Sequence, residues 1–351
     1  MAAFTPVPSH SLIVEPTDGK ALVLSQINSA KRSLDLAIYE VSDSTVLSAL
    51  VAAQRRNVPV RVLYNWYSFD PAIQQSDIAP AIDHLAEAGI LCRRAPQTFE
   101  VTHEKVCVVD ARVALVMTFN LVAEYFERTR DFGVVTAVPG EVAEIATVFE
   151  ADWNSQPLVP SVTTLVWSPT NSRGRLVALI GSASKTLEVY NEELSDPGIM
   201  GALASAAQRG VRVRVIAAVL ASESKENANA AGITYLTSHS VQAVCKAFPV
   251  TASSGTVPIY IHAKAIVADF GASNARAFVG SENFSCVSLD ENRECGILVS
   301  EPDVLAGLES TFESDWAQPS VKVEPDSTPL APCPTDSVSR TKVRVASRQL
   351  H

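Results

Sequence analysis

Two short stretches of the sequence carry the same polar residues at the same spacing. Residues 103–110 read His-x-Lys-x-x-x-x-Asp, and residues 262–269 repeat the pattern. Splitting a phosphodiester needs a nucleophile, a proton donor and groups that neutralise the phosphate oxygens. Two imidazoles and two ammonium groups supply these functions, and two copies of the pattern are much harder to obtain by chance than one. The pair therefore predicts chemistry on a phosphate ester.

Each stretch is followed by the same further elements. A hydroxyl and an amide lie two positions apart in "MTFN" (117–120) and in "GSEN" (280–283), and an acid follows each amide at an equal distance. Residues two apart on a strand share a face, so both histidines and lysines can point toward one site between the copies. The complete sets are His103, Lys105, Thr118, Asn120 and Asp131, and His262, Lys264, Ser281, Asn283 and Glu294.

The repeat extends over most of the chain, which identifies an internal duplication. Helical apolar patterns alternate with short β-branched strands in both copies, and this alternation predicts an α/β fold. The matching segments are 32–43 with 185–196, 49–65 with 202–218, and 147–154 with 310–317.

The proline-containing segment 155–163 is the predicted junction between the copies. It divides the chain into a first half (1–157) and a second half (158–317). Residues 318–351 are rich in Pro, Ser and Thr without sustained periodicity, so we expect a disordered tail. A docking strand at 342–347 is the alternative.

Composition narrows the class of protein. With 47% hydrophobic residues in 351, the chain can bury a substantial core, and no apolar run approaches the length of a membrane span. No signal peptide is visible, which predicts a cytoplasmic protein by default and leaves a trimmed, secreted chain open. The net charge of -10 disfavours non-specific binding to nucleic acid. The six cysteines show no zinc spacing and are predicted to be buried apolar residues rather than a disulfide framework.

The paired His-Lys-Asp motifs, with a downstream Gly-Ser-x-Asn-like element, resemble the phospholipase D superfamily. The resemblance covers roughly residues 12 to 317. It implies a pseudo-twofold α/β sandwich with one active site at the seam of the halves, without a metal or another cofactor. Since one chain holds both motifs, a monomer is sufficient for the site. Met117 and Thr118 replace the glycine and serine of the second copy, which makes the half-sites unequal.

The resemblance also implies a covalent phosphohistidine. We expect neutral His103 to attack phosphorus while protonated His262 donates to the departing alcohol and then deprotonates the incoming water or alcohol. Asp131 and Glu294 are expected to accept a ring N–H from the histidines. The residues expected to hold the phosphoryl oxygens are Lys105, Thr118, Asn120, Lys264, Ser281 and Asn283.

Four acidic residues are predicted to have structural roles. Asp110 and Asp269 face away from the motif histidines by strand parity. Glu40 and Glu193, matched across the repeat, are expected to close strand ends or hydrogen-bond loops.

The motifs alone do not identify the substrate, because phospholipids and nucleic acids both contain a phosphodiester. The leading prediction is a phospholipase D-type enzyme that hydrolyses phospholipids, or transfers their phosphatidyl group, during transient contact with a membrane surface. A cardiolipin-synthase-like phosphatidyltransferase is a close variant, a metal-independent endonuclease is the less favoured enzymatic alternative, and a catalytically silent binding module is a third class. Trp66, Tyr67 and Phe69, at a strand end, are predicted to rim the pocket, pack under a lid or stack on bases, and residues 245–260 to form another wall.

Overall fold

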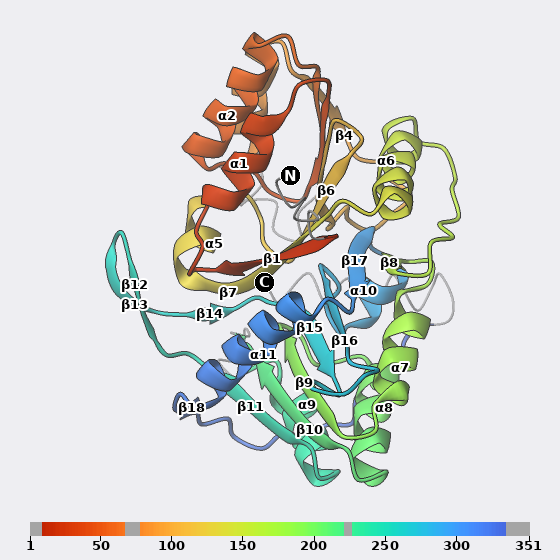
Figure 1. Cartoon of the computed structure of the whole chain (residues 1–351). Helices are drawn as coiled ribbons and strands as arrows, with labels where there is room; N and C mark the ends of the chain where they lie inside the picture. The colour runs from red at the N-terminus through yellow and green to blue at the C-terminus, as the bar shows by residue number, and fades with distance from the viewer. Residues whose placement is uncertain (1–8, 67–77, 221–226, 335–351) are drawn as a thin grey trace, which may run out of the picture.

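The computed structural model describes residues 9–66, 78–220 and 227–334. Each half of the chain is built on its own mixed sheet, and helices cover both sheets (Figure 1). The predicted α/β class and the duplication are confirmed, because the two sheets share one strand order around the motif strands.

The first sheet has the order β1-β7-β6-β5-β2-β3-β4, and β14 from the second half pairs with β7. Strands β2, β3 and β4 are parallel, and the strands from β5 to β1 are antiparallel. The strands are β1 (His10–Glu15), β2 (Leu34–Ile38), β3 (Val60–Tyr64), β4 (Leu91–Arg94), β5 (Lys105–Val109), β6 (Val113–Met117) and β7 (Thr129–Thr136).

The second sheet repeats this topology in the order β18-β11-β10-β9-β15-β16-β17-β8. A separate hairpin, β12 with β13, projects beside α5 (Figure 1). The strands are β8 (Leu165–Ser168), β9 (Thr186–Asn191), β10 (Arg212–Ala217), β11 (Gln242–Lys246), β12 (Pro249–Ala252), β13 (Gly255–Pro258), β14 (Tyr260–Ile261), β15 (Ala265–Ala268), β16 (Arg276–Gly280), β17 (Glu294–Val299) and β18 (Ser320–Val321).

The helices form three layers around the two sheets. Helices α1, α2 and α4 pack on the outer face of the first sheet, and α7, α8 and α9 on the outer face of the second. Helices α6 and α11 contribute to a central core that both sheets share. The helices are α1 (Ala21–Ser29), α2 (Ser44–Arg55), α4 (Ala79–Glu87), α5 (Ala123–Arg128), α6 (Pro139–Trp153), α7 (Ser172–Ser182), α8 (Pro197–Gln208), α9 (Ala230–Ser238), α10 (Cys286–Asp290) and α11 (Pro302–Trp316).

The matched aspartates of the repeat begin corresponding helices. Asp43 accepts hydrogen bonds of 2.9 Å from the backbone N–H groups of Thr45 and Val46 at the start of α2. Asp196 accepts one of 2.8 Å from the N–H of Ile199 at the start of α8. A carboxylate at this position satisfies amides that have no partner within the helix. The repeated aspartates thus fix where the first helix after β2 and β9 starts.

Two buried ion pairs join the halves and explain the repeated Asp-Trp motif at the ends of α6 and α11. Arg130, before the acid of the first half, binds Asp315 on α11 with Nε–Oδ2 at 2.6 Å. Arg293, before the acid of the second half, binds Asp152 on α6 with Nε–Oδ2 at 2.8 Å. Each arginine thus finds its carboxylate in the opposite half. A guanidinium can be buried at this depth only when a carboxylate compensates for its lost hydration.

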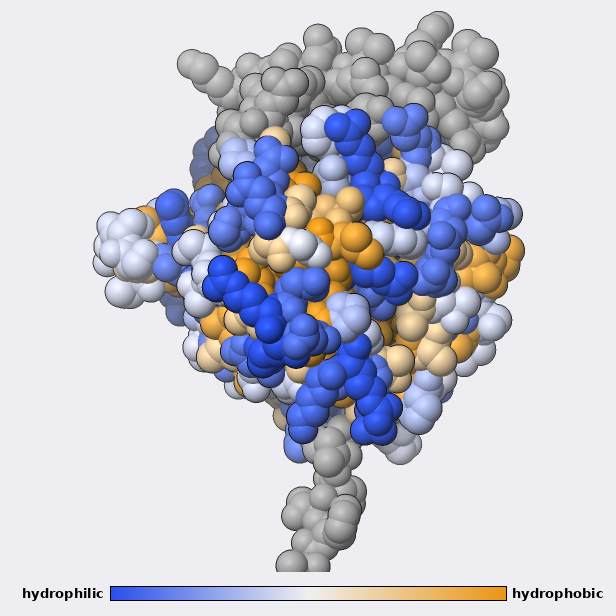
Figure 2. Space-filling model, turned by 90° about the horizontal axis from the view of Figure 1, so that it is seen from above, coloured by the Kyte–Doolittle hydropathy of each residue, from blue (hydrophilic) through white to orange (hydrophobic). Residues whose placement is uncertain are grey.

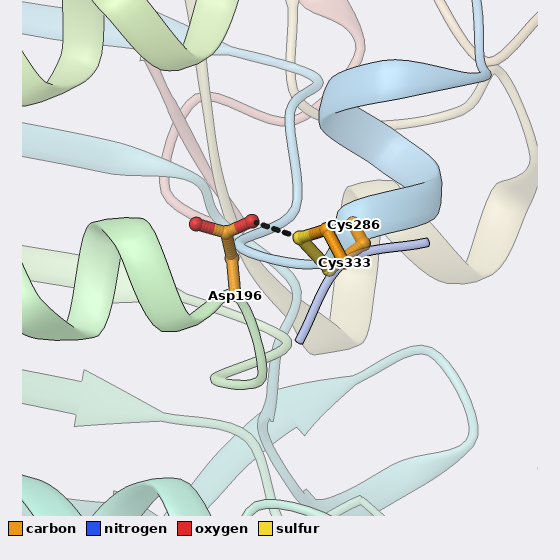
Figure 3. A group of neighbouring side chains, drawn as sticks. All are labelled: Asp196, Cys286 and Cys333. Atoms are coloured by element: carbon orange, nitrogen blue, oxygen red, sulfur yellow. Dashed lines mark hydrogen bonds between the residues drawn. A yellow bond between two sulfur atoms is a disulfide. The ribbon is translucent and has the colours of Figure 1, made fainter. Parts of the chain in front are cut away.

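The cysteine prediction is wrong for two of the six residues. Cys286 and Cys333 form a disulfide, and Cys333 Sγ lies 3.2 Å from Asp196 Oδ2 (Figure 3). This bond could not be predicted from the sequence, because the two cysteines are 47 positions apart and meet only when the C-terminal segment folds back. Cys107, Cys245 and Cys295 are free and buried, as predicted, and Cys92 is free and half-buried.

The C-terminal segment is placed where the sequence predicted disorder. Strand β18 pairs with β11, and Val321, Val323 and Leu330 pack on the core of the second half. The disordered tail predicted from residue 318 is therefore wrong for residues 318–334, because apolar side chains and the disulfide attach them. Residues 335–351, which include the alternative strand at 342–347, lie outside the described residues. The predicted junction at 155–163 falls in the connection between α6 and β8.

Within the part of the chain that the structure describes, no helix is both long and apolar enough to cross a bilayer. The face seen from above the first half has an apolar patch ringed by hydrophilic residues (Figure 2).

Replacing Cys333 with serine should release the C-terminal segment. We expect the free energy of unfolding to fall by about 2–4 kcal/mol, because the disulfide closes a loop between residues 47 positions apart. Urea denaturation without reductant measures the effect. Cys92→Ser, at a free cysteine, is the control and should change stability by less than about 1 kcal/mol. Equal unfolding midpoints for Cys333→Ser and the parent would contradict the tether.

Replacing Asp315 with asparagine should leave Arg130 buried without a carboxylate. We expect a loss of about 3–5 kcal/mol in the free energy of unfolding, measured by chemical denaturation. Glu324→Gln is the matched control, because its pair with Lys322 is almost fully exposed and should contribute less than about 1 kcal/mol. Similar losses in the two variants would show that the buried pair contributes no more to the free energy of unfolding than the exposed pair does.

Candidate active site

The two motif segments lie at the seam, and each pairs with the backbone of the opposite half. The N–H of His103 donates to the carbonyl of Arg293 at 2.8 Å. The N–H of His262 donates to the carbonyl of Arg130 at 3.2 Å, next to the pairing of β14 with β7. Because an acid directly follows each arginine, this pairing brings each histidine beside the acid of the other half.

Both histidines contact these acids through Nδ1. His103 Nδ1 lies 2.8 Å from Glu294 Oε2, and His262 Nδ1 lies 2.9 Å from Asp131 Oδ1. Both carboxylates are fully buried. In a neutral imidazole, a carboxylate at Nδ1 selects the tautomer with the proton on Nδ1 and leaves Nε2 with a free lone pair, and in a protonated ring Nε2 is the nitrogen that can give its proton to a substrate. The contacts expected from the sequence are therefore present, and both cross the seam.

Neighbouring polar groups hold the two acids in place. Glu294 Oε1 accepts from the Ser288 hydroxyl at 2.8 Å and from Asn292 Nδ2 at 3.0 Å. Asp131 Oδ2 accepts from the Thr129 hydroxyl at 2.5 Å. These donors fix the position of each carboxylate and so orient the imidazole bound to it.

The two motif hydroxyls form hydrogen bonds within the protein. Thr118 donates to Asp131 and accepts from the N–H of Phe132 at 2.9 Å. The Ser281 hydroxyl accepts from the N–H of Cys295 at 3.1 Å. Both side chains are fully buried. Their short side chains end near the acids, where groups of the neighbouring strands use their hydrogen bonds.

The two motif lysines are completely buried. Lys105 Nζ donates to the carbonyl of His103 at 2.7 Å, and Lys264 Nζ donates to that of His262 at 2.6 Å. Burial lowers the pKa of Lys105 to about 7, and the charge of Lys264 lowers it further against the attraction of Glu294. Lys105 is thus a cation whose charge is readily lost near neutral pH.

Burial also keeps His103 neutral. It lowers the pKa of His103 to about 4 and outweighs the opposing effect of the Glu294 carboxylate. A neutral ring with its proton on Nδ1 presents a nucleophilic nitrogen at Nε2.

The asparagines are held by matched glutamates. Asn120 Nδ2 lies 3.4 Å from Glu40 Oε2, and Asn283 Nδ2 lies 3.0 Å from Glu193 Oε1. Glu40 and Glu193 therefore hold the motif amide groups, whereas the sequence analysis expected them to close strand ends or hydrogen-bond loops.

The third motif residue stabilises a loop at the far end of the strand. Asp110 accepts hydrogen bonds from the backbone N–H groups of residues 31–33, and Asp269 from those of residues 184–186. These bonds hold the pKa of both carboxyls below the usual range against the effect of burial, to about 2 for Asp269. The structural role predicted from parity agrees with this position away from the histidines.

Four residues near the histidines were missed by the sequence analysis. The Tyr39 ring lies 4.8 Å from the His103 ring, and the Tyr125 ring lies 4.8 Å from that of His262. Glu192 pairs with Lys264, and Tyr260 donates to Glu192. Aligning the halves by identity concealed Tyr39 and Glu192, because they occupy the same repeat position with different residue types. Examining positions where the aligned halves carry different residue types would have found both residues.

The half-sites also differ behind the acids. A side chain at Gly280 or Gly296 would collide with the carboxyl group of Glu282. Burial, reinforced by the charge of Glu294, raises the pKa of Glu282 well above its usual value. The glycine of the second motif thus makes room for a buried carboxyl group, whereas the buried Met117 stands at the corresponding sequence position of the first half.

The predicted walls are only partly described. Trp66 is half-buried, with the Arg94 guanidinium 3.5 Å from its ring centre, and Tyr67 and Phe69 lie outside the described residues. The segment 245–260 forms the β12–β13 hairpin, where the Ser253 hydroxyl donates to Glu127 on α5 at 2.6 Å. This segment reaches the site through Tyr260 at its end.

Two groups of possible metal ligands occur among the described residues, and neither includes a motif histidine. In the first group, Cys286 and Cys333 are oxidised to a disulfide, so they offer no thiolate. In the second, the carboxylate of Glu188 binds Arg214 at 2.8 Å. The motif imidazoles use Nδ1 for the acids described above.

Comparisons with known proteins place the chain in a family. The family described as "Cardiolipin synthase, PLD-like domain" matches residues 23–153 and again residues 176–316. The chain is 31% identical to mitochondrial cardiolipin hydrolase of Xenopus laevis over 132 residues, which cover 37% of this chain and 59% of the relative. It is 25% identical to phospholipase D of Rickettsia bellii (strain RML369-C) over 147 residues, or 40% and 65% of the two chains. The chain thus spans less than two thirds of either relative.

Solved structures share the fold over almost the whole chain. Phosphatidylserine synthase of Haemophilus influenzae Rd KW20 has a TM-score of 0.67 at 14% identity, covering 98% of this chain and 95% of that one. Polyphosphate kinase of Porphyromonas gingivalis has a TM-score of 0.68 at 15% identity, covering 96% and 53%. At these identities the likeness concerns the fold alone. With the family match present in both halves, the chain belongs to the phospholipase D superfamily.

Proposed function

We propose that the protein is a phospholipase D-type phosphodiesterase that hydrolyses phospholipids and can transfer the phosphatidyl group to an alcohol. The observation that carries the proposal is the reciprocal pairing of His103 with Glu294 and of His262 with Asp131 across one seam. The two pairs supply a nucleophile and a proton carrier that share one phosphate site. The names of the cardiolipin hydrolase and phospholipase D relatives support a phospholipid substrate.

In the proposed first step, His103 Nε2 attacks phosphorus. A bond forms between Nε2 and phosphorus while the bond from phosphorus to the departing alcohol oxygen breaks. His262 Nε2–H gives its proton to that oxygen, so the alcohol leaves neutral. Glu294 stabilises the positive charge that develops on the His103 ring. The low pKa of His103 supports its assignment as the nucleophile.

In the second step, His262 takes a proton from water, and the water oxygen attacks phosphorus. The phosphorus–nitrogen bond breaks and returns the electron pair to His103. An alcohol in place of water would give transfer instead of hydrolysis. Lys105 and Lys264, with the amides of Asn120 and Asn283, would neutralise the phosphoryl oxygens in both steps. Thr118 and Ser281 act in this scheme through their contacts behind the phosphate site, as positioning residues.

Charge supports a lipid over a nucleic acid. The net charge of -10 repels a polyanion, and phosphate contacts by Lys and Arg dominate nucleic-acid affinity. The endonuclease therefore remains the less favoured alternative. The family description favours testing phosphatidyl transfer alongside hydrolysis. Transient contact with a membrane surface is part of the proposal, since a phospholipid is presented there.

Two assays in EDTA should separate the alternatives. With phosphatidylcholine and ethanol we expect phosphatidic acid and phosphatidylethanol, measured by mass spectrometry, and with plasmid DNA we expect no nicking. His103→Ala and His262→Ala should each lower turnover by at least about 10³-fold, because one removes the nucleophile and the other the proton carrier. Nicking without lipid turnover would favour the endonuclease, and full activity in either variant would exclude the shared site.

The pH dependence of kcat/KM should be bell-shaped, with a maximum between about pH 4 and pH 7. His103 becomes protonated as the pH falls through about 4, which removes its lone pair, and Lys105 loses its charge as the pH rises through about 7. Turnover of bis(p-nitrophenyl) phosphate measures both limbs. Lys105→Arg should move the basic limb upward, because a guanidinium stays charged. A parent enzyme with full activity at pH 9 would refute the assignment of this limb to Lys105.

A further inference from the structure

One carboxylate breaks the symmetry of the two half-sites. Glu192 follows β9, and the corresponding residue after β2 is Tyr39. The Tyr39 ring packs against His103, and its centre lies 5.3 Å from Lys105 Nζ. Glu192 instead places a carboxylate 2.7 Å from Lys264 Nζ. Tyr39 and Glu192 thus occupy equivalent positions beside the motif lysines, but one presents an aromatic ring and the other an anion.

Two donors and an imidazole nitrogen of the second half-site lie around one oxygen of this carboxylate. Glu192 Oε2 lies 2.7 Å from Lys264 Nζ, 3.3 Å from Asn283 Nδ2 and 3.6 Å from His262 Nε2. The other oxygen, Oε1, accepts from the Tyr260 hydroxyl at 2.6 Å. An ammonium, an amide and an imidazole are the groups that a phosphoryl oxygen requires.

We propose that the Glu192 carboxylate occupies the position of a phosphoryl oxygen in the free protein and that a phosphodiester displaces it from Lys264. This inference rests on the proposed function, because it takes the same lysine, amide and imidazole as phosphate ligands. Two anionic oxygens cannot share the Lys264 ammonium at hydrogen-bond distance in this buried site without strong repulsion. Binding of phosphate therefore requires the glutamate to move.

The exchange is feasible because it conserves charge around Lys264. Lys264 is fully buried, so its ammonium needs a counter-ion at all times. The attraction of Lys264 outweighs burial and holds the pKa of Glu192 below its usual range, so Glu192 is an anion at neutral pH. A phosphodiester brings one negative charge and can replace it. The free energy needed to move Glu192 is subtracted from the affinity for phosphate.

Glu192 could instead be a permanent support that positions Lys264 for the substrate. The two roles predict opposite effects when its charge is removed. If Glu192 competes with phosphate, removing its charge frees Lys264 and strengthens phosphate binding. If Glu192 instead supports Lys264, removing its charge leaves Lys264 less well placed and weakens phosphate binding.

Titration of inorganic phosphate at pH 7, followed by isothermal calorimetry, distinguishes them. We expect Glu192→Gln to lower the dissociation constant by about tenfold, which corresponds to about 1.4 kcal/mol. Glu124→Gln is the control for net charge, because Glu124 is 58% exposed on the nearby α5 and should change binding by less than about twofold. Equal or weaker binding by folded Glu192→Gln overturns the proposal.

A second variant keeps the test decisive if Glu192→Gln does not fold. Tyr260→Phe removes the donor to Glu192 Oε1 and leaves the carboxylate charged. It should ease displacement of the glutamate and tighten phosphate binding by about threefold. Unchanged or weaker binding by this variant also counts against the proposal.

The test of the role of Glu192 and the test of the proposed function can fail independently of each other. If phospholipid is hydrolysed but neither variant binds phosphate more tightly, only the role of Glu192 is wrong. If Glu192→Gln binds phosphate more tightly but no phospholipid is turned over, the role of Glu192 holds and the proposed function fails. With an active protein, Glu192→Gln should lower KM for bis(p-nitrophenyl) phosphate, whereas a support for Lys264 predicts a higher KM.

Discussion

The site depends on buried charges that are neutralised across the seam between the halves. Each motif histidine binds a carboxylate of the opposite half, and each arginine before that carboxylate binds an aspartate of the opposite half. Removing such groups from water costs several kcal/mol unless a partner compensates. Neither half could bury its own set alone, so closing the seam and assembling the site are one event.

Duplication supplies a symmetric frame, and a few substitutions make its two halves chemically different. Both histidines have a carboxylate at Nδ1 and a tyrosine ring at 4.8 Å, but His262 also has the Glu192 carboxylate 3.6 Å from Nε2. The two half-sites are therefore chemically unequal, as a reaction that uses one ring as nucleophile and the other as proton carrier requires.

The period-two pattern of strands was a reliable guide to which side a residue faces. It placed Asp110 and Asp269 away from the histidines, where they bind loop amides. It could not give the partners of a short side chain: Thr118, expected at the phosphate, donates to Asp131, and Ser281 accepts from the N–H of Cys295. Parity fixes a direction, whereas the neighbouring strands decide which hydrogen bonds a short side chain can make.

The duplication, the α/β class and the two sets of motif residues could be predicted from the sequence, because repetition and strand periodicity are visible along the chain. The folded chain was needed to show which acid meets which histidine, that Glu192 faces Lys264, and that Cys286 and Cys333 are joined. These contacts join residues far apart in the chain. Their formation depends on packing the two sheets around α6 and α11, which no local pattern encodes.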